Sequence, residues 1–330
     1  MEEFVSKDVN TILSKLNDND KKEYVDVLDN FEIGYEDTLN ISDYNAFGLE
    51  VEYEEIYKAQ MDYFVLKNLD KWFSKEERDF TIGGEVISPI LNDNKKTWED
   101  LKKLCEYLKN KNALMDGRAG GHIHFSSKML GSNIENWKNF LFMYSAFENI
   151  IYRFSYGDRV NGREFIIANA YPISIELSRK YEDIKCCDDI SKLYKIIYEE
   201  DRFAGLNLYN VKWDNLDKEI NKNTIEFRMP NGTDEEVIWQ NNVYFFTKLL
   251  LSYNKEIDED LLRFYIFKNK ERYSYVFFNK VNLNQAFYLA DMIFDNNYDK
   301  MKFMKQYYKD GSVSRGKYRT VYSSKKLIKW

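Results

Sequence analysis

The 330-residue sequence predicts an α+β fold in which an antiparallel sheet carries helices on one face. Two observations support this class. Short segments that alternate apolar and polar residues lie between longer segments with helical periodicity. The alternating segments are apolar on one side only, whereas strands of a parallel sheet are usually buried on both faces and read as continuous apolar runs. We therefore expect a sheet with one packed face and one polar face.

The elements are expected in the following order. Residues 1–40 place apolar side chains at helical spacing and predict an N-terminal helical elaboration. Strands are predicted at 47–53, 79–90, 120–126, 203–213 and 223–230. Helices are predicted at 56–73, 98–110 (with Thr97 as its N-cap), 133–154 and 234–253, and the last eighty residues are expected to be mostly helical. This order suggests a central domain at 41–254 and a C-terminal extension at 255–330.

The composition indicates a globular protein of the cytoplasm. Apolar residues make up 44% of the chain and aromatic residues 17%, which is enough for a sizeable core. The N-terminus is acidic and lacks the basic and apolar regions of a signal peptide, and the apolar stretches are too short to span a membrane. Three cysteines cannot form a disulfide framework, and their odd number fits a reducing compartment.

The charge is unevenly distributed. Residues 302–329 contain nine Lys or Arg and a single acid, Asp310, so that this tail carries a net charge of +8 and the rest of the chain −15. Tyrosines lie between the basic residues, a combination that can bind an acidic partner or a nucleic acid. The alternative is a solvated, partly helical C-terminus that balances an acidic body.

Three of the predicted strands carry pairs of functional side chains at positions i and i+2, which lie on one face of a strand. These pairs are Glu50 and Glu52, His122 and His124, and Glu226 and Arg228. The residues between them are apolar and face the other way. Carboxylates suit Mg²⁺ or Mn²⁺, an imidazole is acceptable to Mn²⁺, and an Arg beside an acidic ligand is placed to meet phosphate oxygens. The pattern predicts a site for a divalent metal and a phosphate.

Other interpretations of these residues are weaker. A single pair would indicate only a solvated strand face, but the two histidines are the only ones in the chain and share one strand. A zinc site would need a third histidine or an acid soon after the pair, where Ser126, Ser127 and Lys128 stand. The stretch from Gly311 to Lys317 fits a P-loop pattern, but Tyr318 replaces the Ser or Thr that would hold Mg²⁺, so a loop is expected there.

Five blocks of the sequence, in this order, resemble the amidoligase family of the glutamine synthetase and glutamate-cysteine ligase superfamily. The blocks are Phe47-Gly-Leu-Glu-Val-Glu52, Gly84-Glu-Val-Ile-Ser-Pro89, Gly121-His-Ile-His-Phe125, Leu206-Asn-Leu208 and Thr224-Ile-Glu-Phe-Arg228-Met-Pro-Asn-Gly-Thr233. The resemblance extends over residues 44–250, whereas the N-terminal and C-terminal parts have no counterpart that we can name.

The resemblance implies a curved antiparallel sheet that forms a funnel, in which ATP and the substrates meet at two or three divalent ions. The residues that resemble metal ligands are Glu50, Glu52, Glu85, His122 and Glu226. The residues that would contact ATP are Arg228, His124, Arg202 and Asn207, and the residues expected to be catalytic are Arg228, His124 and Glu52. The side chains of Arg153, Arg159 and Arg163 would either bind a substrate carboxylate or lie on the surface.

The expected activity is an ATP-dependent, Mg²⁺- or Mn²⁺-dependent ligase that joins a carboxylate to an amine through an acyl phosphate. Its substrates would be small molecules or peptides, and the resemblance suggests a phage or mobile-element setting. Two alternatives remain open at this point. One is a phosphotransferase of the guanidino-kinase type on the same fold. The other is a non-catalytic scaffold whose basic tail binds a partner, although a scaffold has little reason to keep so many costly carboxylates.

Overall fold

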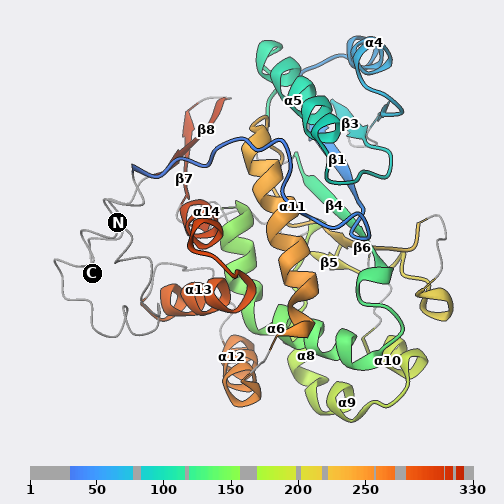
Figure 1. Cartoon of the computed structure of the whole chain (residues 1–330), viewed down its shortest axis with the longest axis vertical. Helices are drawn as coiled ribbons and strands as arrows, with labels where there is room; N and C mark the ends of the chain where they lie inside the picture. The colour runs from blue at the N-terminus through green and yellow to red at the C-terminus, as the bar shows by residue number, and fades with distance from the viewer. Residues whose placement is uncertain are drawn as a thin grey trace.

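The computed structural model shows an α+β protein with a six-stranded sheet and many helices packed around it (Figure 1). The structure describes residues 30–76, 83–115, 119–156, 169–197, 202–217, 222–255, 258–271, 280–307, 309–314 and 317–322. Among these residues no helix is long and apolar enough to cross a membrane.

The large sheet has six strands in the order β2-β3-β1-β4-β6-β5, and every neighbouring pair is antiparallel. The strands are β1 (Phe47–Tyr53), β2 (Phe73–Lys75), β3 (Gly84–Ile87), β4 (Gly121–Ser126), β5 (Leu206–Asn207) and β6 (Thr224–Phe227). This agrees with the predicted antiparallel α+β class. The sheet is open, with β2 and β5 at its edges.

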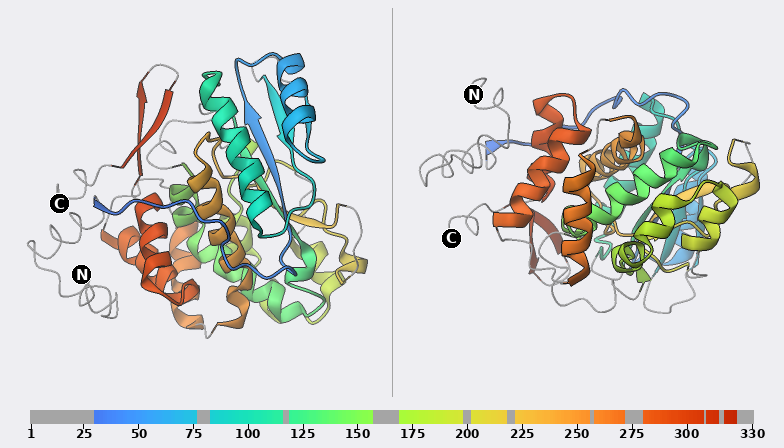
Figure 2. Two further views of the ribbon diagram at one scale, coloured as in Figure 1. Left: turned by 45° about the horizontal axis from the view of Figure 1, so that its top comes forward. Right: turned by 90° about the horizontal axis from the view of Figure 1, so that it is seen from below.

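The apolar face of the sheet is covered by three helices, α5 (Lys95–Asn110), α6 (Ile134–Tyr156) and α11 (Glu236–Leu250) (Figures 1 and 2). Each helix places an aromatic ring against a strand. The ring of Trp98 in α5 stacks on Phe47, with centroids 5.5 Å apart. Phe227 of β6 contacts Phe140 of α6 edge-on at 6.4 Å and stacks on Phe246 of α11 at 4.3 Å. Because this face is so well packed, the polar residues of the strands are turned to the opposite face.

Helix α6 also forms the centre of a second layer. Its far side packs against α12 (Glu259–Glu271), α13 (Lys280–Ile293) and α14 (Asn297–Tyr307). Phe154 of α6 stacks on Phe303 of α14 at 5.2 Å, and Phe147 stacks on Tyr288 of α13 at 6.1 Å. Three short helices, α8 (Ser174–Arg179), α9 (Tyr181–Cys186) and α10 (Ile190–Ile197), lie at the end of α6 that is lowest in Figure 1.

The segment that precedes β1 is fastened to these helices although it has no regular structure from residue 31 to residue 46. The carboxylate of Asp93 accepts hydrogen bonds from the backbone N–H groups of Leu39 and Ile41, each at 2.9 Å. Glu36 forms an ion pair at 2.9 Å with Lys302 of α14. Lys302 is only 4% exposed. The predicted N-terminal helices concern mainly residues 1–29, which lie outside the described residues.

Several predicted boundaries were wrong. The helix predicted at 56–73 is α4 (Lys58–Asn68), and the chain then forms the short edge strand β2. The N-cap of α5 is Asn94 rather than Thr97, because the Asn94 side chain accepts a hydrogen bond from the Thr97 backbone N–H at 3.0 Å. The strand predicted at 203–213 shrinks to the two residues of β5, since turns occupy most of the segment.

The tail also differs from the prediction. The three helices α12, α13 and α14 agree with a mostly helical C-terminal part, but β7 (Lys309–Ser314) and β8 (Lys317–Tyr322) then pair as an antiparallel hairpin. In Figure 1 this hairpin stands away from the large sheet. The segment that resembled a P-loop therefore lies in a hairpin and not between a strand and a helix, which removes the P-loop interpretation.

Candidate active site

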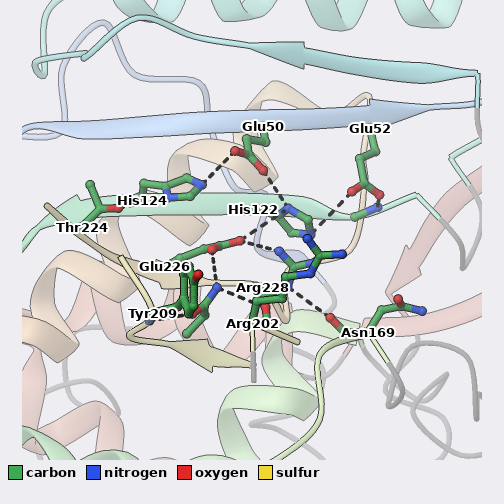
Figure 3. Close-up of polar contacts among 12 residues, drawn as sticks. Glu50, Glu52, His122, His124, Asn169, Arg202, Tyr209, Thr224, Glu226 and Arg228 are labelled. Carbon is green, nitrogen blue, oxygen red and sulfur yellow. Dashed lines mark hydrogen bonds and ion pairs between the residues drawn. The ribbon is translucent and has the colours of Figure 1, made fainter. Parts of the chain in front are cut away.

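The register of the sheet gathers the predicted site residues on its polar face. Glu50 of β1 lies opposite His122 of β4, and His124 lies opposite Glu226 of β6. Directly opposite residues in antiparallel strands have their Cβ atoms about 4.5 to 5.5 Å apart, so their side chains can touch. The strand pairs predicted from the sequence therefore come together as one cluster (Figure 3).

Glu50 is the central acid of this cluster. Its Oε2 lies 3.0 Å from Nδ1 of His122, and its Oε1 lies 3.1 Å from Nε2 of His124. Each histidine therefore meets a different oxygen of the same carboxylate (Figure 3). His124 also lies 3.5 Å from the Thr224 hydroxyl through Nδ1. The two histidine side chains are 7% and 18% exposed, and that of Glu50 is 25% exposed.

The proximity of opposite charges sets the pKa values of this group. Burial by itself would raise the pKa of Glu50, but the hydrogen bonds to His122 and His124 outweigh it, and the pKa lies far below its ordinary value. Burial would lower the pKa values of both histidines, yet the neighbouring carboxylates raise them: Glu52 and Glu50 raise the pKa of His122, and Glu50 and Glu226 raise that of His124. The carboxylates thus favour the protonated, positively charged form of both histidines.

Glu226 is clamped from two sides. Its Oε1 accepts a hydrogen bond from the Arg228 guanidinium at 2.6 Å, and its Oε2 accepts one from the Asn207 side-chain amide at 2.7 Å. Arg228 is itself fixed, because its Nε–H donates to the backbone carbonyl of Asn169 at 3.1 Å. Glu226 is 4% exposed, so its position and that of the guanidinium are tightly determined.

Glu52 lies two residues beyond Glu50 in β1, on the same face of the sheet. One of its oxygens accepts a hydrogen bond from the backbone N–H of Gly120, and the other lies 3.6 Å from Nε2 of His122. Gly120 fits here only because it has no side chain: a Cβ atom would lie 2.8 Å from Nε2 of His122 and 3.1 Å from Oε2 of Glu52. The absence of a Cβ therefore lets the acid and the imidazole approach the backbone.

Glu85 of β3 lies opposite Glu52 and occupies the side of the face near β2. It is 3% exposed and forms an ion pair with Lys75, its cross-strand neighbour in β2. The five predicted metal ligands thus share one face, but they do not form one compact group. Glu85 and Glu52 lie opposite each other and outside the group of ligand atoms that Glu50, His122 and Glu226 form.

The donor set of three residues fits a divalent ion. Among the residues that the structure describes, one group offers three ligand atoms that lie within 4.8 Å of one another, and it consists of Glu50, His122 and Glu226. Two carboxylates and one imidazole match the ligand preferences of Mn²⁺ and are compatible with Mg²⁺. The lowered pKa of Glu50 keeps its carboxylate ionised and ready to bind.

The residues predicted to contact ATP include one amide that is engaged within the protein and two guanidinium groups that lie near the ring of Phe203. The Asn207 side chain is fully engaged within the protein, because its oxygen accepts from the Tyr209 backbone N–H at 2.8 Å and its amide donates to Glu226 and to the Arg202 carbonyl. It therefore positions Glu226. The Arg202 residue is exposed, and its guanidinium lies 4.8 Å from the centroid of the Phe203 ring. The guanidinium of Arg228 lies 6.0 Å from the same ring.

Of the other predicted arginines, Arg153 does not join the cluster. Arg153 is fully buried in α6, and its Nε–H donates to the backbone carbonyl of Tyr307 at 3.0 Å, so it is neither a surface residue nor a member of the polar face. Its prediction as a ligand for substrate carboxylate is therefore not supported. Arg159 and Arg163 lie outside the described residues.

Two contributors were missed by sequence reasoning. Asn169 acts through its backbone carbonyl, which any residue type could supply, so no sequence signal exists for it. Lys75 was missed because its strand has only three residues and begins at Phe73, the last residue of the predicted helix. The alternation of exposed Phe73, half-buried Ser74 and exposed Lys75 is too short to reveal a strand by itself.

The comparisons with known proteins agree with this arrangement. Residues 7–250 match the sequence model of a family described as "Putative amidoligase enzyme". A comparison with curated proteins finds no matching relative. The matched segment includes all six strands of the large sheet and every residue of the cluster. Since the match extends over more than half of the chain, the protein belongs to this amidoligase family, whose name denotes ligase-type enzymes.

Proposed function

We propose that the protein is an ATP-dependent ligase that joins a carboxylate to an amine through an acyl phosphate, with Mg²⁺ or Mn²⁺ as cofactor. The family supports a ligase-type enzyme in general. The finer proposal rests on the chemistry of the polar face. That face combines acids able to hold a divalent ion with a guanidinium able to grip a phosphate, which are the two requirements of phosphoryl transfer.

The observation that carries the proposal is the clamp on Glu226. Its carboxylate faces both the ligand group with Glu50 and His122 and the anchored guanidinium of Arg228. Because Glu226 contacts both, a phosphate bound at the ion would also lie next to the Arg228 guanidinium. Because the Asn169 carbonyl already fixes this guanidinium, little reorganisation is needed when charge develops on the phosphoryl oxygens.

Glu50, His122 and Glu226 would hold the divalent ion, which supplies neutralisation of phosphate charge and polarisation of the phosphoryl group. Arg228 supplies a further cation that never deprotonates. His124 lies on the same face beside Glu50 and can donate a hydrogen bond to a phosphoryl oxygen while it is protonated. Glu52 is held by the Gly120 N–H and can accept a proton from the attacking amine through its other oxygen.

In the proposed reaction, a substrate carboxylate oxygen attacks the γ-phosphorus of ATP, and the bond from that phosphorus to the ADP oxygen breaks. The amine nitrogen then attacks the carbonyl carbon of the acyl phosphate. The carbon–oxygen bond to phosphate breaks, the nitrogen loses a proton to a base such as Glu52, and the products are an amide, ADP and phosphate.

Calorimetric titration with a non-hydrolysable ATP analogue provides the direct test. We expect binding in Mn²⁺, loss of binding in EDTA, and at least tenfold weaker binding after Glu226→Gln or Arg228→Gln. The matched controls are Glu176→Gln and Arg179→Gln, which remove the partners of an exposed ion pair within α8. Folded wild-type protein that binds no nucleotide in the presence of metal would refute the proposal.

Product analysis distinguishes the ligase from the phosphotransferase. Pools of carboxylates and amines are incubated with ATP and Mn²⁺, and new products are identified by mass spectrometry. An amide that appears together with ADP and phosphate supports the ligase. A phosphorylated guanidine without an amide product would instead establish the phosphotransferase.

A further inference from the structure

The side of the polar face near β2 contains two buried acids next to each other. Glu52 of β1 lies opposite Glu85 of β3, and they are 9% and 3% exposed. Like charges directly opposite each other in a sheet are destabilising, the more so when they are shielded from water. Such a pair requires a cation, and in carboxylate sites that cation is often a divalent metal ion.

In this protein the chain itself supplies a cation at that position. Lys75 of β2 lies opposite Glu85, and its ammonium forms an ion pair with Oε1 of Glu85. The row Lys75, Glu85, Glu52 therefore extends across three neighbouring strands. Glu52 in turn receives the hydrogen bond from the Gly120 N–H and faces Nε2 of His122.

The backbone holds Lys75 in this place. A Cβ atom on Gly84 would lie 2.7 Å from the Lys75 carbonyl oxygen and 2.8 Å from the Tyr53 hydroxyl oxygen, so only glycine allows β2 to approach β3 so closely. The Lys75 side chain is 57% exposed and reaches from the edge of the sheet to an acid that is almost fully buried. A flexible four-carbon stem with a charged end is suited to this geometry.

The geometry near β6 is different. Within the described residues, the group whose ligand atoms lie close enough to share an ion contains Glu50, His122 and Glu226, and neither Glu52 nor Glu85 belongs to it. Glu52 lies two residues further along β1 than Glu50, opposite Glu85, and Glu85 in turn lies opposite Lys75 and forms the ion pair with it. The polar face thus has one group of ligands for a divalent ion, formed by Glu50, His122 and Glu226. Beside it, Glu85 is paired with the Lys75 ammonium.

We propose that the Lys75 ammonium takes the place of a second divalent cation, so that the protein holds a single divalent ion, bound by Glu50, His122 and Glu226. This inference rests on the proposed metal-dependent function and narrows the sequence-based expectation of two or three ions. It assigns to Lys75 the neutralisation of Glu85 and Glu52. Positive charge is then supplied across the face by Lys75, the ion and Arg228.

The test counts the Mn²⁺ ions bound by the full chain. Free Mn²⁺ is followed by electron paramagnetic resonance during titration of the nucleotide-free protein, and bound Mn²⁺ is obtained by difference. We expect one equivalent for the wild-type protein. Lys75→Met retains an unbranched stem without the charge, and we expect it to bind a second equivalent. Lys75→Arg retains the charge and should stay at one equivalent.

The control variant is Lys95→Met, which removes an exposed lysine that forms an ion pair with Asp37 at 3.0 Å. It should bind one equivalent, as the wild-type protein does. In Lys75→Met combined with Glu85→Gln, the second equivalent should disappear, which identifies Glu85 as its ligand.

Two different failures can be told apart. Wild-type protein that binds two or three equivalents overturns the role of Lys75 and leaves the proposed function intact. Folded wild-type protein that binds none overturns both. Because the count on the wild-type protein needs no variant, the inference remains falsifiable even if Lys75→Met does not fold. If Lys75→Met is folded, as judged by circular dichroism, and still binds one equivalent, Lys75 does not exclude a second ion.

Discussion

The two ends of the polar face hold equally buried acids in different ways. Near β6, Glu226 is fixed by Arg228 and Asn207, both of which are anchored by backbone groups. Near β2, Glu85 is paired with Lys75, whose side chain is 57% exposed on an edge strand. The comparison shows that the burial of a carboxylate does not by itself determine how rigidly the carboxylate is held. The freedom of its partner decides whether the acid is rigidly positioned or only neutralised.

The largest expected difference between the two ends is in stability. Glu226→Gln removes the charge that compensates the mostly buried Arg228 guanidinium, and we expect it to lower the free energy of unfolding by about 2 to 3 kcal/mol, somewhat below the range for fully buried pairs. Glu85→Gln should cost less than about 1 kcal/mol, because Lys75 can turn into water. Urea unfolding in EDTA measures both, and equal losses would contradict the comparison.

The second difference concerns the two cations. Arg228→Lys cannot keep both the contact with Glu226 and the contact with the Asn169 carbonyl, since lysine has no planar fork of donors. We expect nucleotide affinity in Mn²⁺ to fall by about 10- to 100-fold. Lys75→Arg, the reverse exchange, should change it by less than about threefold, because an exposed ion pair tolerates either cation. Calorimetry of the two variants decides whether the ends differ in this way.

A third prediction tests whether Asn207 positions Glu226 or only contributes to the stability of the fold. Asn207→Ala leaves one oxygen of Glu226 without its amide donor, and we expect Mn²⁺ affinity to fall by about tenfold. Asn223→Ala is the matched control, because Asn223 is also a buried amide with two backbone partners, those of Lys212 and Asn215. Both variants should lose about 1 to 2 kcal/mol of stability. Equal Mn²⁺ affinities in the two variants would show that Asn207 does not position the site.

The smallest effect concerns pH, measured as the melting temperature in EDTA. The lowered pKa of Glu50 stabilises the fold above the ordinary carboxyl value of 4.5, and this contribution is lost as the pH falls. The raised pKa values of His122 and His124 stabilise it fully below the ordinary value of 6.5, and that contribution is lost as the pH rises through the raised values. We expect a maximum between these limits.

Mn²⁺ should flatten the decline at high pH, because the bound ion replaces the protons of the site. His124→Gln should also reduce the decline, since one of the two titrating groups is removed. A melting temperature in EDTA that keeps rising from pH 6.5 to pH 8.5 would contradict the assignment of raised pKa values to the two histidines.

Much of the site could be predicted from residue spacing. The alternation in β1, β4 and β6 placed Glu50, His122 and Glu226 on one face because side chains of a strand alternate strictly between the two faces. Antiparallel pairing then brought them together. The site residues with the strongest sequence signals are therefore those that regular strands position.

The remainder depends on structure that leaves little trace in the sequence. The strand β2 is too short for its alternation to be recognised, so Lys75 was not associated with Glu85. The Asn169 carbonyl is chemically the same in every residue, and the role of Asn207 follows from which donors its side chain meets. The funnel shape and the domain boundaries remain predictions.

The cross-strand register also constrains how this gene can change. Insertion of one residue within β1 would turn the side chains beyond it to the other face, so that acids would enter the aromatic core and apolar residues would reach the ligand group. A substitution alters one contact, whereas a change in strand length alters all the contacts downstream. Natural variation in length is therefore expected in the connections between strands, where the chain can change without disturbing the side chains that the strands place on the polar face.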